Sequence, residues 1–253
     1  GFVRGGFGLA LDATLSEQIR ICGPLVAIWF FVFSLPLFMF TRDVTVQSLP
    51  IGTAVRTGTS QLWQTLKKLP SMPNILWFLI ARMIYADGIN TLFAFGGIYA
   101  AGTFGMSFND VLVFGIAMNI SAGVGAALFA WIDDYLGAKM TIQISLAAMI
   151  VLGVIILFVH SVNLFWIFAL LIGLFLGPVQ AASRSMMVRI VPPEQTSELF
   201  GMYALSGKAT AFFGPWLFGL FTLWFGSQRW GMATIMLFLF IGGALLTNKV
   251  HDA

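Results

Sequence analysis

The sequence predicts an all-α membrane protein, a polytopic helix bundle with about seven transmembrane helices. Hydrophobic residues make up 59% of its 253 residues and charged residues only 9%, whereas about 25% of the residues in a typical soluble domain are charged. The mean hydropathy is +0.93. Uncharged apolar runs, many of them close to the ~20 residues that cross a bilayer as a helix, recur along the chain. The lipid bilayer is therefore its first expected partner.

Composition also excludes several classes of function. The net charge is +3, and the basic residues are too few and too scattered to indicate a nucleic-acid partner. The single cysteine, Cys22, excludes a disulfide framework within the chain. Because only His160 and His251 accompany that cysteine, we expect no metal site and no cofactor. The sequence shows no nucleophile–base arrangement, so we expect no enzyme.

Apolar and charged segments divide the chain into parts whose side of the membrane follows from the positive-inside rule. Because the chain begins at Gly1 rather than Met, we expect it to be a piece of a longer protein. We expect an extramembrane lead-in at 1–20, a transmembrane helix at 21–41, a cytoplasmic central loop at 42–72, a six-helix domain at 73–248 and a cytoplasmic tail at 249–253.

The spans of the six-helix domain follow from uncharged runs and from local start and stop signals. Ser107 and Asp110 form a capping box that opens the second of these helices. The uncharged run 140–183 is too long for one span and is expected to divide near His160. The first two helices are expected over Pro73–Ala100 and from Ser107 to about Ile132. The next two lie on either side of His160–Asn163. The last two are expected over Ser197–Phe225, as one span, and over Trp230–Asn248.

The central loop contains a candidate amphipathic helix, Ser60–Leu69. Its leucines at 62, 66 and 69 share one face, and its lysines at 67 and 68 lie elsewhere, as in helices that lie in a membrane interface. A disordered linker is the alternative interpretation of this segment.

Two charged residues lie inside the span Pro73–Ala100. At a rise of ~1.5 Å per residue, Asp87 lies about 21 Å from Pro73, deep in the bilayer, where a charge costs roughly 2.5–3.5 kcal/mol. Arg82 and Asp87 are about 140° apart around the helix, so each is expected to find a partner on another helix. Two interpretations are open: structural ion pairs that fix helix packing, or a substrate or proton site.

A second deep charge, Lys208, lies about 16 Å into the expected helix Ser197–Phe225, among small residues that leave room for a carboxylate or a substrate. We expect Lys208 to be buried and to pair with Asp87 as the charged core of a site. Asn119 is expected to make a helix–helix hydrogen bond or to contact a ligand. The candidate residues of the substrate or ion pathway are Arg82, Tyr85, Asp87, Asn90, Asn119, Gln180 and Lys208.

Charged residues at the expected cytoplasmic ends of the helices form candidate gates. The acidic hairpin at Asp133 and Asp134 is expected to meet the basic helix end at Arg184 and Arg189, which would hold one closed state. Glu198 opens the next helix, where its negative charge suits the positive end of the helix dipole. The candidate gate residues are Asp133, Asp134, Lys139, Arg184, Arg189 and Glu198.

With one helix, a long basic loop and six further helices, the chain resembles the C-terminal half of a major facilitator superfamily (MFS) transporter. The hairpin 130–139 is similar to that superfamily's loop motif, small-x-x-x-Asp-x-x-Gly-x-basic, through Asp134, Gly137 and Lys139. It departs from the motif at Tyr135 and Ala138, where basic residues are usual.

Four further segments resemble one branch of that superfamily, typified by the fungal vacuolar amino-acid effluxer of autophagy and its bacterial relatives. The segments are YADGINT (85–91), GPVQAASRS (177–185), PPEQTSELFGMYALSGKATAFFGP (192–215) and GSQRWG (226–231). The resemblance implies part of a secondary transporter that exports small polar solutes such as amino acids by alternating access. It also implies a missing N-terminal half as partner and a small-molecule substrate, with proton coupling left open.

A different class of protein is also compatible with these segments: a membrane receptor or assembly subunit with the same fold and no transport activity. For either class we expect a multi-pass integral membrane protein, in a bacterial inner membrane rather than a vacuolar membrane.

Overall fold

The computed structural model describes residues 20–41 and 50–251. The chain forms two compact units, residues 1–55 and 56–253, and each is described on its own. The first unit contains α2 (Cys22–Phe40), an apolar helix of transmembrane length in which no residue is buried. The expected lead-in lies almost wholly outside the described residues, as do Arg42 and Asp43 of the expected central loop.

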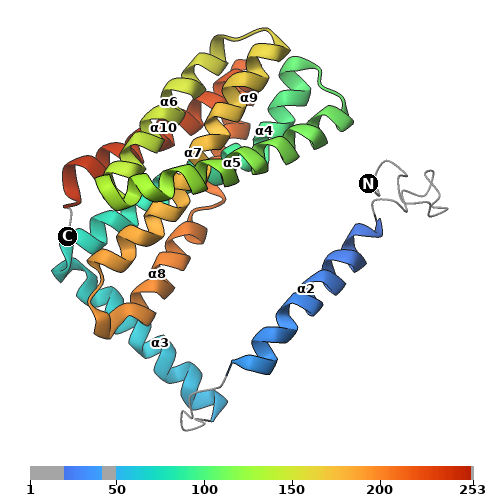
Figure 1. Cartoon of the computed structure of the whole chain (residues 1–253). Coiled ribbons are helices and arrows are strands. Elements are labelled where there is room, and N and C mark those ends of the chain that lie inside the picture. Colours follow the sequence, from blue (N-terminus) through green and yellow to red (C-terminus); the bar gives the residue numbers. More distant parts are fainter. Residues whose placement is uncertain (1–19, 42–49, 252–253) are drawn as a thin grey trace. The chain divides into compact units, whose positions relative to one another are not determined.

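The second unit is a bundle of helices, and within the described residues no strand is present (Figure 1). The expected all-α, polytopic fold is therefore confirmed. After α3 (Ile51–Lys68), which begins in the first unit, and the short 3-10 helix η2 (Leu69–Ser71), the bundle consists of α4 (Pro73–Phe104), α5 (Phe108–Leu136), α6 (Ala138–Phe158), α7 (Val162–Ile190), η3 (Pro193–Gln195), α8 (Thr196–Ala209), α9 (Phe213–Phe225) and α10 (Gln228–Lys249).

Local signals in the sequence set several of these boundaries. Ser107 and Asp110 form the expected capping box at the start of α5. Helix α6 ends at Phe158 and α7 begins at Val162, so the uncharged run divides where it was expected to. The amphipathic segment of the loop is helical, and α3 begins nine residues earlier than expected, at Ile51 instead of Ser60.

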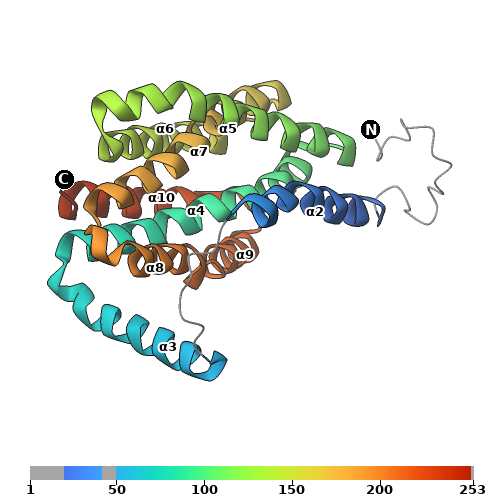
Figure 2. The same ribbon diagram turned by 60° about the horizontal axis from the view of Figure 1, so that its bottom comes forward.

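The bundle is held together by two close helix pairs and by a helix that connects them. Helix α10 packs along α4, α5 packs along α7, and α6 lies against both α7 and α10 (Figures 1 and 2). Helices α8 and α9 pack on α4, with α9 also against α10. The core includes the fully buried side chains of Phe78, Leu146, Leu176 and Leu239. This arrangement places α4 next to α7 and α8, where the candidate site lies.

Glycines bring α5 and α7 into backbone contact. A Cβ atom on Gly177 would lie 2.1 Å from the carbonyl oxygen of Ala122, and one on Gly125 would lie 1.7 Å from that of Leu174. The hydroxyl of Ser121 donates to the carbonyl of Leu170 across the same interface, at 2.6 Å. The absence of a side chain therefore allows the two helices to approach this closely, as is typical of membrane helix packing.

The expected continuous span Ser197–Phe225 is wrong, because the chain forms two helices with a turn at 210–212. Pro215 explains the break. Proline has no backbone N–H to donate to the carbonyl of residue 211, and its ring clashes with that carbonyl in a continuous helix. In the second helix Pro215 occupies the first turn, where the missing N–H costs nothing. Within the described residues, six helices are individually long and apolar enough to span a membrane, and α8 and α9 together cover the residues of the remaining expected span.

Candidate functional site

A polar pocket of about 400 Å³ lies between α4, α7 and α8. It brings together five of the seven expected pathway residues, together with Arg184, which was expected at a gate. Its lining residues are Arg82, Tyr85, Ala86, Ile89 and Asn90 from α4, Val179, Gln180, Ser183 and Arg184 from α7, and Tyr203, Ala204, Gly207 and Lys208 from α8.

Arg82 is the most constrained charge of the pocket. Its Nη1 atom donates to the backbone carbonyl of Tyr203 at 2.6 Å and to the hydroxyl of Ser206 at 2.8 Å. The guanidinium carbon lies 3.5 Å from the centroid of the Tyr203 ring, in cation–π contact. Gly207 leaves space for this arrangement, because a Cβ there would lie 2.8 Å from Nη1. Since these partners use one of the guanidinium nitrogens, the donors on the other two can bind a ligand.

The wall of the pocket at α7 contains a buried hydroxyl pair. Ser183 donates its hydroxyl proton to the carbonyl of Val179 at 2.5 Å, so it accepts the bond from the Tyr85 hydroxyl at 2.7 Å. Both side chains are buried, at 2% exposure each. This pair fixes α4 against α7 and holds a polar surface beside the arginine.

The pocket is cationic. Arg82, Arg184 and Lys208 line it, and among the described residues no aspartate or glutamate does. Gln180 is exposed, and the amide of Asn90 makes a long bond of 3.4 Å to the carbonyl of Gly207. Guanidinium, ammonium and amide N–H groups around one cavity suit an anionic group, and a carboxylate can be bound by arginine through two parallel bonds.

Lys208 is not buried as expected. It lies exposed in the last turn of α8, at the edge of the pocket. In the part of the chain that the structure describes, the ion pair expected between Lys208 and Asp87 is not formed. The helix break explains the difference, because α8 ends at Ala209 and Lys208 therefore stands at a helix end.

Asp87 faces the other part of the broken helix. Its Oδ2 atom accepts the backbone N–H of Gly214, in the first turn of α9, at 2.9 Å. The residue is 2% exposed, and its Oδ1 atom is buried without a hydrogen-bond partner. The free N–H groups and positive dipole end of a helix attract a carboxylate, so Asp87 caps α9 from the neighbouring helix. The residue lines a small apolar pocket of about 330 Å³ instead of the polar one.

Asn119 also lies outside the polar pocket. Its side-chain amide donates to the carbonyl of Gly115, in its own helix, at 2.8 Å. Among the described residues, Asn119 therefore does not form the expected hydrogen bond to another helix, and a ligand contact remains the alternative. Asn119 lines a larger, mainly apolar cavity of about 600 Å³ bounded by α4, α5, α6, α7 and α10.

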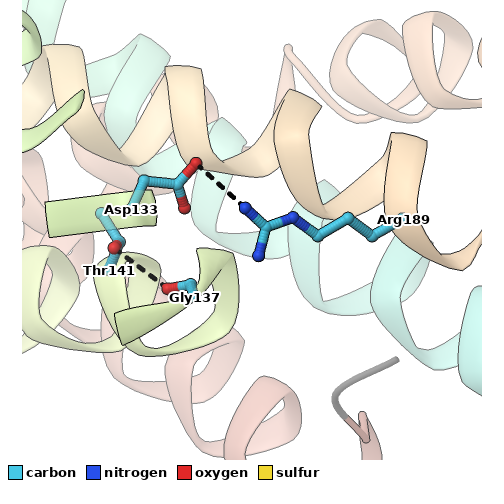
Figure 3. A network of polar contacts seen from close by, with 4 residues as sticks. All are labelled: Asp133, Gly137, Thr141 and Arg189. Carbon is cyan, nitrogen blue, oxygen red and sulfur yellow. Dashed lines mark hydrogen bonds and ion pairs between the residues drawn. The ribbon is translucent and has the colours of Figure 1, made fainter. Parts of the chain in front are cut away.

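One of the expected gate contacts is present at the C-terminal end of α7. Arg189 Nη2 lies 3.8 Å from Asp133 Oδ2, beside the turn where Thr141 donates to the carbonyl of Gly137 (Figure 3). Gly137 has a φ of +84°, a conformation that favours glycine. The expected contact of the acidic hairpin with the basic end of α7 is thus formed by Asp133.

The remaining gate candidates lie outside the contact between Asp133 and Arg189. Asp134, which matches the loop motif, is exposed, and Lys139 is half-buried at the start of α6. Arg184 lines the polar pocket, one and a half turns before Arg189 on α7. Glu198 accepts a 2.5 Å hydrogen bond from the hydroxyl of Thr65 on α3.

Comparison with known proteins identifies the family. Residues 10–250 match the family model described as "Vacuole effluxer Atg22 like". The chain belongs to this family. Its Atg22-like relatives include the "Uncharacterized MFS-type transporter YxiO" of Bacillus subtilis (strain 168), which is 22% identical over 237 residues, covering 93% of this chain and 55% of the relative.

Fungal members of the Atg22-like family are similarly distant. "Autophagy-related protein 22" of Saccharomyces cerevisiae (strain YJM789) is 24% identical over 243 residues, covering 81% of this chain and 46% of the relative. The protein of that name from Pichia angusta is 26% identical over 242 residues, covering 82% and 43%. The chain therefore spans about half the length of the curated relatives it matches. It is a multi-pass integral membrane protein of a transporter family.

Three neutral residues that bind the candidate residues were not expected from the sequence. Tyr203 holds Arg82, Ser183 binds Tyr85, and Thr65 binds Glu198. Serine, threonine and tyrosine are common in membrane helices, so their positions alone indicate no site.

Proposed function

We propose that this chain is the C-terminal half of a secondary transporter that exports small polar solutes such as amino acids by alternating access. The cationic polar pocket between α4, α7 and α8 is the observation that carries the proposal. Sites of secondary transporters typically lie deep in the membrane, between repeated helical units, and are often built on discontinuous helices. The break between α8 and α9, next to the pocket, supports the same reading.

Each side of the pocket has a role in this proposal. The free donors of Arg82 bind the carboxylate of the solute, and Lys208 contributes a second positive charge at the pocket's edge. Asn90 and Gln180 supply neutral donors and acceptors for the remaining polar groups of the solute. Differential contacts of this kind between conformational states are what a transport cycle requires.

The contact between Asp133 and Arg189 serves as a gate in the proposed cycle. It joins the α5–α6 turn to the end of α7, at the end of the bundle where Lys139 and Lys249 also lie. Arg229 lies at the opposite end. By the positive-inside rule, the end with more basic residues faces the cytoplasm. A bacterial inner membrane is the proposed location, with a proton as an optional coupling ion.

Counterflow separates this proposal from a receptor or an assembly subunit of the same fold. The full-length protein is reconstituted in proteoliposomes loaded with an unlabelled amino-acid mixture, and uptake of labelled amino acids is followed. A transporter gives transient accumulation of label, which empty liposomes do not show. Saturable binding without accumulation would identify a receptor and refute the proposal. We also expect residues 1–253 alone to show no counterflow, because the site needs the other half for alternating access.

A further inference from the structure

Helix α3 presents an apolar strip that does not face the bundle. From Arg56 onward α3 belongs to the second unit, and its contact with α8 runs through the buried side chain of Thr65. Leu62, Trp63 and Leu66 remain 47%, 60% and 47% exposed. Spacings of three and four residues place Leu62 and Leu66 on one face of a helix, with Trp63 at its border.

The charges of α3 are all positive. The sequence Ile51–Lys68 contains Arg56, Lys67 and Lys68 and no acidic residue. The ammonium group of Lys67 lies 5.5 Å from the centroid of the Trp63 ring. A tryptophan bordered by lysines next to an apolar strip is the pattern of helices that lie in the headgroup region of a membrane.

Helix α3 directly precedes a membrane span in the chain. Its last residue, Lys68, is followed after the short stretch 69–72 by the first residue of the span α4, Pro73. Both views show α3 leaving the start of α4 across the direction of the bundle helices (Figures 1 and 2). The strip is therefore held at the level where the transmembrane helices begin.

We propose that α3 binds the anionic surface of the bilayer. Leu62, Trp63 and Leu66 enter the boundary between headgroups and acyl chains, and Lys67, whose ammonium group lies beside the Trp63 ring, contacts lipid phosphates. A partner protein would also cover an apolar strip, but the uniformly positive charge and the position beside a span favour an anionic lipid surface.

A hydrogen bond joins this surface to α8, the helix that forms one wall of the polar pocket. Thr65 donates to Glu198, in the first turn of α8, at 2.5 Å, and α8 carries Tyr203 and Lys208 of the pocket. Lipid binding by α3 therefore restrains the helix that forms one wall of the pocket. The lipid contact itself does not depend on the proposed transport function.

Spin-label accessibility in nanodiscs tests the lipid contact on the full-length protein. Cys22 and any cysteine outside this chain are replaced by serine, and a nitroxide label is attached at Leu66→Cys. The matched control is Gln64→Cys, which is also exposed but lies on the opposite side of α3. The probes are oxygen, which partitions into lipid, and a neutral nickel chelate, which stays in water.

We expect the label at 66 to be reached by oxygen and shielded from nickel in nanodiscs that contain phosphatidylglycerol, while the label at 64 stays accessible to nickel. Lys67→Gln with Lys68→Gln, or discs of phosphatidylcholine alone, should weaken this difference. Equal nickel accessibility at both positions in anionic discs would overturn the proposal. Shielding of position 66 from both probes would also overturn it, because the occupant would then be protein.

The restraint on α8 is tested with a second label at Gly201→Cys. Gly201 is exposed, and a Cβ atom there meets nothing within 4 Å. In anionic discs the distance distribution between labels at 66 and 201 should be narrow. Thr65→Val should broaden it without changing the oxygen accessibility at 66. A distribution equally narrow in Thr65→Val would show that the hydrogen bond does not restrain α8.

Discussion

Replacing Asp87 tests whether this carboxylate caps α9 or serves as the partner of Lys208. In Asp87→Asn the amide oxygen can still accept the N–H of Gly214, but the negative charge is lost and an NH2 group replaces the buried Oδ1. A buried donor without a partner costs about 1–3 kcal/mol, and the lost charge at the helix N-terminus costs about 0.3–1 kcal/mol more. We therefore expect the free energy of unfolding to fall by about 1.3–4 kcal/mol.

The assay is unfolding of the full-length protein in mixed micelles, with Lys208→Met as the second arm of a double-mutant cycle. Lys208 is exposed and has no carboxylate partner among the described residues. Lys208→Met should therefore have a small effect that adds to that of Asp87→Asn within about 0.5 kcal/mol. If Lys208→Met instead restores the stability lost in Asp87→Asn, the two residues are an ion pair and the capping account is wrong.

The remaining predictions concern packing and the gate. Gly177→Ala should destabilise the protein by at least about 1–3 kcal/mol, because its Cβ would lie 2.1 Å from the Ala122 carbonyl oxygen; Gly123→Ala, where a Cβ meets nothing within 4 Å, should be neutral or stabilising in the same melts. If the proposed cycle holds, Arg189→Gln should shift the full-length protein toward states with an open cytoplasmic side. Alkylation of a single cysteine placed in the pocket should then be faster than in the parent, and an unchanged rate would argue against a gate at Asp133 and Arg189.

Much of the bundle could be predicted from the sequence because the bilayer restricts the backbone conformations that a spanning segment can adopt. Every backbone group in lipid must be satisfied internally, so an uncharged apolar run of sufficient length indicates a helix. The capping box of Ser107 and Asp110 predicted the start of α5 from neighbouring residues alone, and this prediction is confirmed. The break between α8 and α9 at 210–212 was not predicted, because the hydropathy of this segment does not distinguish one long helix from two short ones. Pro215 was the available signal, because its ring clashes with the carbonyl of residue 211 in a continuous helix, although α7 continues through Pro178.

The pocket was predicted in part because polar side chains are rare in membrane helices. Arg82, Asn90 and Gln180 were candidates on that ground, and the structure brings them to one pocket. Partnerships between helices could not be predicted, because the rotation of each helix depends on its packing. Asp87 and Lys208 had opposite charges and similar depths, yet the carboxylate is bound by the backbone of Gly214, a donor that only the helix break exposes.

In the proposed transport cycle, the pocket binds the carboxylate of the solute through Arg82. The most direct measurement compares counterflow inhibition by an amino acid and by its carboxamide, in the full-length protein and in its Arg82→Gln variant. Bonds to a charged group contribute about 1.5–3 kcal/mol, so the parent protein should prefer the acid by about 10- to 100-fold. Arg82→Gln should lose that preference while Arg189→Gln, outside the pocket, keeps it. A variant at Arg82 that still prefers the acid to the same degree would contradict the account.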